Sequence, residues 1–353
     1  MTAPQYEFSI DVGGTFTDCI EHSSSTIKRH KLLSSGRTLG KIKTIAAEAI
    51  HDPLRVDDPI GFWVGTQLSV INEKESAGNI VNGSDDDTKR TIIASDSTGT
   101  LTLDSPLPTS VIGESYEIRT ELSAPIIGIH HLLGIPLNES LPPINLRLGT
   151  TRGTNALLTR TGAKTALVTT VGFKDLLEIG NQNRPKLFEL NIQKTAPLIT
   201  TSIEINERID THGNILQSIN RDQVRCQLVK LFSEGIESLA VCLLNSFVNP
   251  EHEQVIAEVA NEIPFASISI SSRVSPLIKI IPRADTTVLD AYLNPVLNNY
   301  LEQLRAYLHV DSNMRFLTSA GGLIPADQFS GKDSILSGPA GGVVGFSQAA
   351  KRA

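Results

Sequence analysis

The feature that most constrains this chain is a short apolar stretch near its N-terminus that runs into two consecutive glycines. The string from Phe8 to Asp18 reads FSIDVGGTFTD, so hydroxyl groups follow the glycines and a carboxylate lies on each side of them. Gly13 and Gly14 carry no Cβ and reach backbone angles that are closed to other residues, so a tight turn here can aim its N–H groups at an anion. The pattern therefore predicts two strands joined by a turn that binds phosphate.

The two carboxylates of this string indicate a metal ion. Asp11 and Asp18 repel a phosphate unless a cation lies between them. Thr15 and Thr17 add hydroxyl donors. Mg²⁺ prefers oxygen ligands, keeps several of its waters, and typically joins one or two carboxylates to the phosphates of a substrate, so we expect Mg²⁺ and a nucleotide here. The alternative is an ordinary β-hairpin closed by a Gly-Gly turn, and the string alone does not decide between the two.

The composition narrows the class of partner. The chain has 353 residues, enough for two or three domains, and its hydrophobic content of 40% suits buried cores. Its net charge of −7, with no cluster of Lys and Arg, argues against a surface for nucleic acid or for an anionic membrane. No apolar run approaches the ~20 residues of a membrane-spanning helix, and no signal peptide opens the chain. These features predict a cytoplasmic protein that binds small molecules.

The cysteines agree with a reducing compartment. Cys19, Cys226 and Cys242 are odd in number and lack any C-x-x-C spacing, which indicates free thiols. Cys226 and Cys242 lie in apolar segments, where we expect both side chains to be buried.

The pattern of apolar residues divides the chain into three regions. Residues 1–59 are expected to form the phosphate-binding hairpin region, with a meander of three strands followed by a helix over Leu39 to Ile50. Residues 60–125 consist of short β-rich runs between polar turns, which predicts an inserted small β-barrel or sandwich. In residues 126–353, strands and helices alternate at the spacing of an α/β sheet with helical crossovers.

A second polar string follows a predicted strand at residues 146–148. It reads GTTRGTNALL from Gly149 to Leu158, and a helix is expected to begin near Asn155. The unpaired N–H groups at the start of that helix could bind an anion or a carbonyl group. The alternative is that Thr151 or Thr154 simply caps the helix.

Two further strings are rich in polar or small residues. The loop GNQNRP from Gly180 to Pro185 offers amide groups and the cationic fork of Arg184, which suit a carboxylate-bearing amide, although a solvated loop explains it equally well. The run from Ser337 to Gly345 contains many small residues and opens a helix with a proline just inside. Close helix packing explains this run as well as phosphate binding does.

Together, these strings resemble the N-terminal portion of the hydantoinase A and 5-oxoprolinase family, whose members carry an ATPase core of the actin, Hsp70 and sugar-kinase type. The stretches that carry the resemblance are Asp11 to Asp18, Gly149 to Leu158, Thr165 to Asn191, and Ser337 to Gly345. The resemblance implies an α/β fold, namely a ribonuclease-H-like (actin-like ATPase) lobe with a mixed sheet and helices, which here carries the inserted β-rich domain.

The resemblance also implies an enzymatic activity. Members of the family use ATP to open a cyclic amide, in the simplest case 5-oxoproline to glutamate, by passing the γ-phosphoryl group to the amide oxygen so that water can attack the carbon. A hydantoin is a close alternative substrate. A ketone carboxylase subunit would apply the same phosphoryl activation to a different substrate.

The family pattern further implies roles for particular residues. Asp11 and Asp18 would be catalytic, either holding hydrated Mg²⁺ or orienting the attacking group. The β and γ phosphates of ATP would be bound by Gly13, Gly14, Thr15 and Thr17. The cyclic amide would be contacted by Thr150, Thr151, Thr154, Asn155, Gln182 and Arg184.

One departure from the family pattern concerns the second lobe. Proteins of this fold hold ATP between two similar lobes, and a second Asp-x-Gly-Gly-Thr string is expected soon after Gly338 to Gly342, but none occurs in the sequence. We therefore expect a fragment or split subunit whose partner is a C-terminal lobe or a hydantoinase B-like subunit, with a homo-oligomer as a further option. The non-enzymatic alternative is a truncated ATPase lobe that only binds or scaffolds a partner.

Overall fold

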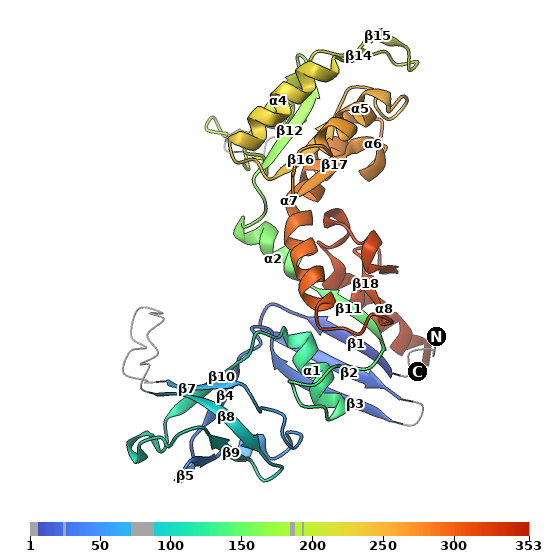
Figure 1. Cartoon of the computed structure of the whole chain (residues 1–353). Coiled ribbons are helices and arrows are strands. Elements are labelled where there is room, and N and C mark those ends of the chain that lie inside the picture. Colours follow the sequence, from blue (N-terminus) through green and yellow to red (C-terminus); the bar gives the residue numbers. More distant parts are fainter. Residues whose placement is uncertain (1–5, 24–25, 72–87, 184–187, 193, 353) are drawn as a thin grey trace. The chain divides into compact units, whose positions relative to one another are not determined.

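The computed structural model describes residues 6–23, 26–71, 88–183, 188–192 and 194–352, and the chain falls into two compact units (Figure 1). The first unit consists of residues 1–151, 301–328 and 337–353, and the second of residues 152–300 and 329–336. None of the helices in the described ranges is long and apolar enough to cross a membrane.

The first unit is built on a six-stranded mixed sheet (Figure 1). Its strands are β1 (Tyr6–Val12), β2 (Phe16–His22), β3 (Ile27–Leu33), β11 (Ile144–Thr150), β18 (Asn313–Leu317) and β19 (Leu323–Pro325). They lie in the order β19-β18-β11-β1-β2-β3, in which β1, β2 and β3 form an antiparallel meander while β11 and β18 run parallel to β1. This arrangement confirms the predicted α/β class with a ribonuclease-H-like lobe.

Alternation along β1 explains which face of this sheet is buried. Phe8, Ile10 and Val12 point into the core, so that Asp11 lies on the opposite, open face. The strand therefore contributes its apolar side chains to the core and its carboxylate to solvent.

Two helices of the first unit contact this sheet. In α1 (Ala124–Leu133), Gly128 lies directly against Cys19 of β2, where a Cβ would overlap the sulfur atom. The helix can therefore approach the strands closely on their buried face. Helix α8 (Ser337–Arg352) contacts β11 and begins at the small-residue run, as predicted.

The first unit also contains a β-rich module, described over residues 38–71 and 88–119, whose strands form a seven-stranded sheet. Its strands are β4 (Thr38–Lys41), β5 (Thr44–Ala46), β6 (Ala49–His51), β7 (Gln67–Ile71), β8 (Lys89–Ser95), β9 (Thr100–Leu103) and β10 (Ser115–Arg119), in the order β4-β10-β7-β8-β9-β6-β5. Strands β4 and β5 are the two edge strands of this sheet, and only Ile42 and Lys43 separate them in the sequence. Because each residue spans at most about 3.5 Å, the sheet must curl until its edges come close. The curled sheet encloses a core that includes Phe62, Trp63 and Tyr116.

The predicted helix over residues 39–50 is wrong. These residues form β4, β5 and β6, which pair with β10 and β9. Ile42 and Ile50 occur at a spacing that a helix could use, but both are instead buried in the core of the β-rich module. Pairing with distant strands thus overrides the local helical pattern. The β-rich sheet begins before residue 60, and the predicted domain boundaries at residues 59 and 125 stay predictions.

The second unit is an α/β structure around a four-stranded parallel sheet. Its strands are β12 (Thr165–Thr170), β13 (Thr201–Ile205), β16 (Ser238–Cys242) and β17 (Ser267–Ile270), in the order β13-β12-β16-β17. Its other elements are α2 (Arg152–Thr159), α3 (Leu176–Ile179), α4 (Arg221–Ser233), α5 (Glu251–Ala260), α6 (Ser271–Val274), most of α7 (Ile280–Arg305), and a hairpin of β14 (Arg208–Ile209) and β15 (Ile215–Gln217). Helices α3, α4 and α5 lie in the connections between successive parallel strands, which confirms the predicted alternation.

Cys226 is exposed on α4, contrary to the prediction that it is buried. The buried side of this helix consists of Val224, Leu228 and Leu231, which recur at helical spacing, and Cys226 falls between them on the solvent side. Cys242 is buried in β16, as expected.

Candidate phosphate-binding site

The turn between β1 and β2 has an exposed tip of two residues. The N–H of Gly13 donates to the carbonyl oxygen of Phe16 across 3.0 Å, which leaves Gly14 and Thr15 at the tip. A Cβ on Gly13 would lie 2.9 Å from that oxygen, whereas the residue does not adopt a positive φ. Glycine is therefore required here because the two sides of the turn approach each other closely, and not because the backbone is left-handed. A tip of this kind is able to present main-chain N–H groups to an anion.

Ser34, the residue after β3, holds this turn in place. The Ser34 N–H donates to the carbonyl oxygen of Thr15 at 2.9 Å, and the Ser34 hydroxyl donates to the carbonyl oxygen of Gly13 at 2.8 Å. Because the hydroxyl has only one hydrogen, Thr17 is the donor in the 2.9 Å bond between the Thr17 and Ser34 side chains. Thr17 is fully buried, so its hydroxyl faces the core and closes the hairpin. Ser34 belongs to no motif, and sequence reasoning missed it.

Three charged side chains lie in one row across β1, β2 and β3. Asp11 is opposite Asp18, Asp18 is opposite Lys31, and all three are exposed on the open face. The ammonium nitrogen of Lys31 lies 3.0 and 3.1 Å from the two Asp18 oxygens. Partial desolvation of the Asp11 carboxylate, together with the negative charge of Asp18, raises the pKa of Asp11. The sequence analysis did not identify Lys31 as a site residue. An antiparallel alignment of the two predicted strands β2 and β3 would have placed it opposite Asp18.

These side chains suit a magnesium–phosphate complex. Among the residues that the structure describes, no group of three or more His, Cys, Asp or Glu side chains could hold a metal ion. Asp11 and Asp18 provide the one or two carboxylates that Mg²⁺ takes when phosphate and water complete its octahedral shell. The donor set therefore fits Mg²⁺ together with a phosphate, and it does not fit a closed site made of protein ligands alone.

The second predicted string begins beside this hairpin. Because β11 runs parallel to β1, Gly149 lies opposite Asp11, and a Cβ there would come within 3.0 Å of the carboxylate. Thr151 donates its N–H and its hydroxyl to the carbonyl oxygen of Val12, at 3.0 and 3.3 Å. Thr150 is fully buried. The structure thus brings Thr150 and Thr151 next to the hairpin, where the Thr151 hydroxyl fastens β11 to β1.

The remaining residues predicted to contact substrate belong to the second unit. Thr154 donates its hydroxyl to the main-chain oxygen of Ile335, and Asn155 is exposed on α2. Gln182 follows α3 with a φ of 56° and lines a cavity of about 430 Å³. Arg184 lies outside the described residues.

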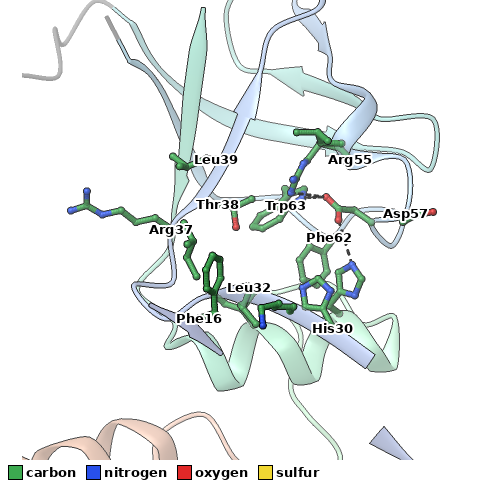
Figure 2. A pocket seen from close by; sticks show the side chains of 16 residues that line it. Phe16, His30, Leu32, Arg37, Thr38, Leu39, Arg55, Asp57, Phe62 and Trp63 are labelled. Atoms are coloured by element: carbon green, nitrogen blue, oxygen red, sulfur yellow. Dashed lines mark hydrogen bonds and ion pairs between the residues drawn. The ribbon is translucent and has the colours of Figure 1, made fainter. Parts of the chain in front are cut away.

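A separate cavity of about 420 Å³ lies beside the hairpin in the first unit (Figure 2). Phe16, His30 and Leu32 border it from the six-stranded sheet, and Phe62 and Trp63 border it from the β-rich module (Figure 2). The cavity therefore marks where the module meets the hairpin strands.

Two histidines stack at this cavity. The ring centres of His30 and His131 are 3.7 Å apart, and His131 lies 3.4 Å from Asp58. Asp58 also accepts a hydrogen bond of 2.6 Å from the indole N–H of Trp63. Burial, together with the neighbouring His131, lowers the pKa of His30 to about 4. His30 is therefore neutral at physiological pH and packs as an uncharged ring.

The strand order and the hairpin define the class of this molecule: it is an α/β protein whose first unit is a ribonuclease-H-like lobe. The chain belongs to the hydantoinase/oxoprolinase family. The family model of the hydantoinase/oxoprolinase N-terminal region matches residues 110–264, and that of hydantoinase/oxoprolinase matches residues 283–353.

Similar curated proteins include 5-oxoprolinases. The 5-oxoprolinase of Saccharomyces cerevisiae is 40% identical over 271 residues, which cover 66% of this chain and 21% of that protein. The 5-oxoprolinase of Dictyostelium discoideum is 42% identical over 275 residues, which cover 68% of this chain and 21% of that protein. The chain thus spans about one fifth of the length of these relatives.

Two solved structures share the fold. Nucleotide-free acetone carboxylase superposes with a TM-score of 0.63 at 18% identity, covering 98% of this chain and 41% of that chain. The ATP-dependent caprolactamase from Pseudomonas jessenii superposes with a TM-score of 0.58 at 21% identity, covering 95% of this chain and 39% of that chain. At these identities the likeness concerns the fold alone.

Proposed function

We propose that this chain provides the phosphate-binding lobe of an ATP-dependent enzyme that opens a cyclic amide, with 5-oxoproline as substrate and glutamate as product. The observation that carries the proposal is the turn between β1 and β2, which Ser34 fastens at Gly13 and beside which Asp11 and Asp18 lie opposite each other. Family membership and the 5-oxoprolinase relatives support the reaction and the substrate.

The chemistry explains why such an enzyme needs a phosphate site. A lactam resists hydrolysis because its amide is stabilised by resonance and an amine is a poor leaving group. Transfer of the γ-phosphoryl group from ATP to the amide oxygen, with ADP as the leaving group, activates the ring carbon toward water. One water adds to this carbon and the ring C–N bond breaks, which leaves an acyl phosphate, and a second water then releases phosphate and the free carboxylate. Phosphoryl transfer depends on positioning and on neutralisation of charge more than on covalent help from the protein.

The contacts of the hairpin residues support a separate proposed role for each of them. Gly14 and Thr15, at the exposed tip, bind the β and γ phosphates through their main-chain N–H groups and the Thr15 hydroxyl. Gly13 shapes the tip, because its own N–H is already donated to Phe16. Thr17 holds the turn through Ser34 rather than contacting phosphate, since its side chain is buried.

The carboxylates have a different role. Mg²⁺, when bound together with phosphate, would neutralise phosphate charge. Asp11 would hold the hydrated ion directly, and Asp18, whose oxygens pair with Lys31, would contact its waters. Asp11 is also proposed to orient the attacking group. The substrate side is proposed to comprise Thr150, Thr151, Thr154, Asn155, Gln182 and Arg184.

We also propose that the complete reaction requires further polypeptide. The chain spans about one fifth of the 5-oxoprolinases that it matches, and a single lobe does not enclose a nucleotide and exclude water by itself. A C-terminal lobe or a hydantoinase B-like subunit would supply the remainder of the nucleotide and substrate sites.

Calorimetry with Mg²⁺–ATP tests the phosphate-binding role. The wild-type chain should bind, and Gly13→Val should not, because its Cβ would meet the Phe16 oxygen and open the turn. Gly342→Val is the matched control, since a Cβ at Gly342 meets nothing within 4 Å. Equal binding by wild type and Gly13→Val, or no binding by either, contradicts the proposal.

Phosphate release distinguishes the possible reactions. With the partner polypeptide added, 5-oxoproline should accelerate release of phosphate from ATP. If only a hydantoin accelerates the release of phosphate, the substrate is a hydantoin and not 5-oxoproline. A rise only with a ketone and bicarbonate would instead identify a carboxylase subunit, and no rise with any of these would leave a non-catalytic lobe.

A further inference from the structure

Lys31 forms an ion pair with one of the two carboxylates of the candidate site. Its ammonium nitrogen lies 3.0 Å from Oδ1 and 3.1 Å from Oδ2 of Asp18, and 5.2 Å from the centre of the Phe16 ring. Both Asp18 oxygens therefore contact a cation that belongs to the protein. Asp11, opposite Asp18 on the neighbouring strand, is left as the second carboxylate of the row.

The charges of this row decide what the site can bind. Two carboxylates, Asp11 and Asp18, and one ammonium group, Lys31, give the row a net charge of −1. A divalent cation that approached Asp18 would have to displace the ammonium group, so only Asp11 is open to a free metal ion. Mg²⁺ gives up its waters reluctantly, and one exposed carboxylate is a weak site for it. Phosphate oxygens would supply the missing ligands, and Lys31 would offset part of their charge.

We propose that Lys31 makes the hairpin selective for metal–phosphate complexes over free divalent cations, an inference that rests on the proposed function. By neutralising Asp18, Lys31 keeps a bare metal ion from being held by two carboxylates. The same positive charge favours the arrival of a phosphate group. Lys31 thus lowers the affinity for a free metal ion and raises the affinity for a metal–phosphate complex.

A surface ion pair without functional consequence is the competing interpretation. Both side chains are about half exposed, 57% for Lys31 and 53% for Asp18, and exposed pairs of this kind contribute little to stability. Removal of Lys31 would then leave metal binding and phosphate binding unchanged. The proposed role instead requires the two affinities to change in opposite directions.

The test compares Lys31→Met with Arg29→Met. Arg29 is exposed on the same strand and the same face but lies opposite Ile20, so its replacement removes an equal charge without touching Asp18. Binding of MnCl2 alone is followed by electron paramagnetic resonance, and binding of Mg²⁺–pyrophosphate by calorimetry. Thermal unfolding establishes that each variant is folded.

Opposite shifts are expected for Lys31→Met. It should bind Mn²⁺ roughly three- to fivefold more tightly than wild type and Mg²⁺–pyrophosphate more weakly by a similar factor, whereas Arg29→Met should change either affinity by less than about twofold. The double variant Asp18→Asn, Lys31→Met returns the row to a net charge of −1 and should bring both affinities back toward wild type.

Two other results would overturn the inference. If both affinities change in the same direction, or if Lys31→Met and Arg29→Met behave alike, Lys31 does not set the selectivity, although the phosphate site itself stands. If wild type does not bind Mg²⁺–pyrophosphate at all, the proposed function fails and the role of Lys31 fails with it.

Discussion

The hydroxyl of Ser34 donates to the main-chain oxygen of Gly13 across 2.8 Å, so that the residue after β3 fastens the turn between β1 and β2. Ser34→Ala removes this bond and leaves the buried Thr17 hydroxyl without its acceptor. We expect the free energy of unfolding to fall by about 1–3 kcal/mol, measured by urea denaturation. Ser35→Ala, at the exposed next position, is the control, and equal stability of the two variants would show that Ser34 does not hold the turn.

Gly40 in β4 packs where a Cβ would overlap the Tyr116 ring and the Asp52 carboxylate, which accepts a 2.6 Å hydrogen bond from Tyr116. Gly40→Ala should therefore destabilise the β-rich module by about 1–3 kcal/mol through overpacking. Trp63 is the one tryptophan in the sequence and lies in the core of this module, so its fluorescence reports the unfolding. A Gly40→Ala protein that unfolds at the wild-type urea concentration would disprove the close packing.

Stability of the first unit should fall with acid because of His30. Its pKa in the folded chain is about 4, against a usual value of 6.5, so the unfolded chain takes up the proton first as the pH falls. The stabilisation that His30 gives as a neutral ring is present above pH 6.5 and is lost progressively between about pH 6.5 and pH 4. The protonation of His30 alone should make the free energy of unfolding about 1–2 kcal/mol lower at pH 5 than at pH 7.

Unfolding followed by Trp63 fluorescence at several pH values measures this dependence. His30→Phe, which keeps a ring beside His131, should flatten the profile between pH 5 and pH 7. His212→Phe is the control, because His212 is exposed in the second unit. A steep profile that persists in His30→Phe would assign the acid sensitivity to another group of the first unit, such as His130, whose pKa is lowered by burial.

The three cysteines should differ in reactivity. Cys226 is exposed, whereas burial raises the pKa of Cys19 to about 12 and that of Cys242 to about 11. In the native protein, a disulfide reagent such as 5,5′-dithiobis(2-nitrobenzoate) should therefore react rapidly with one thiol, and with all three after denaturation. Cys226→Ser should remove the rapid phase. Rapid reaction of a second thiol in the folded protein would contradict the burial of β2 or β16.

Much of the fold could be read from local patterns. The apolar string that runs into Gly13 predicted the two strands β1 and β2 correctly, and the alternation of strands and helices after residue 126 predicted the α/β arrangement of the second unit. The region 39–50 failed because its spacing fits a helix as well as short strands, and only the partner strands β9 and β10 decide between them.

The candidate site could likewise be predicted from the sequence only in part. Asp11, Gly14 and Thr15 lie within one short string, so their nearness could be predicted from the sequence. Ser34 and Lys31 come from β3 and carry no motif, so their contacts with the turn could not. Several predicted substrate residues, among them Gln182, belong to the second unit, and their role stays a prediction.

By itself, the sequence determined that the chain opens with two strands around a glycine turn and that it resembles the hydantoinase/oxoprolinase family, because both follow from residues that are neighbours in the chain. Only the tertiary structure decided that residues 39–50 are strands, that the Thr17 hydroxyl is bonded to Ser34, and that Lys31 neutralises Asp18. These contacts depend on which strands lie side by side and in what register, and a shift of one residue would turn each side chain to the other face of the sheet.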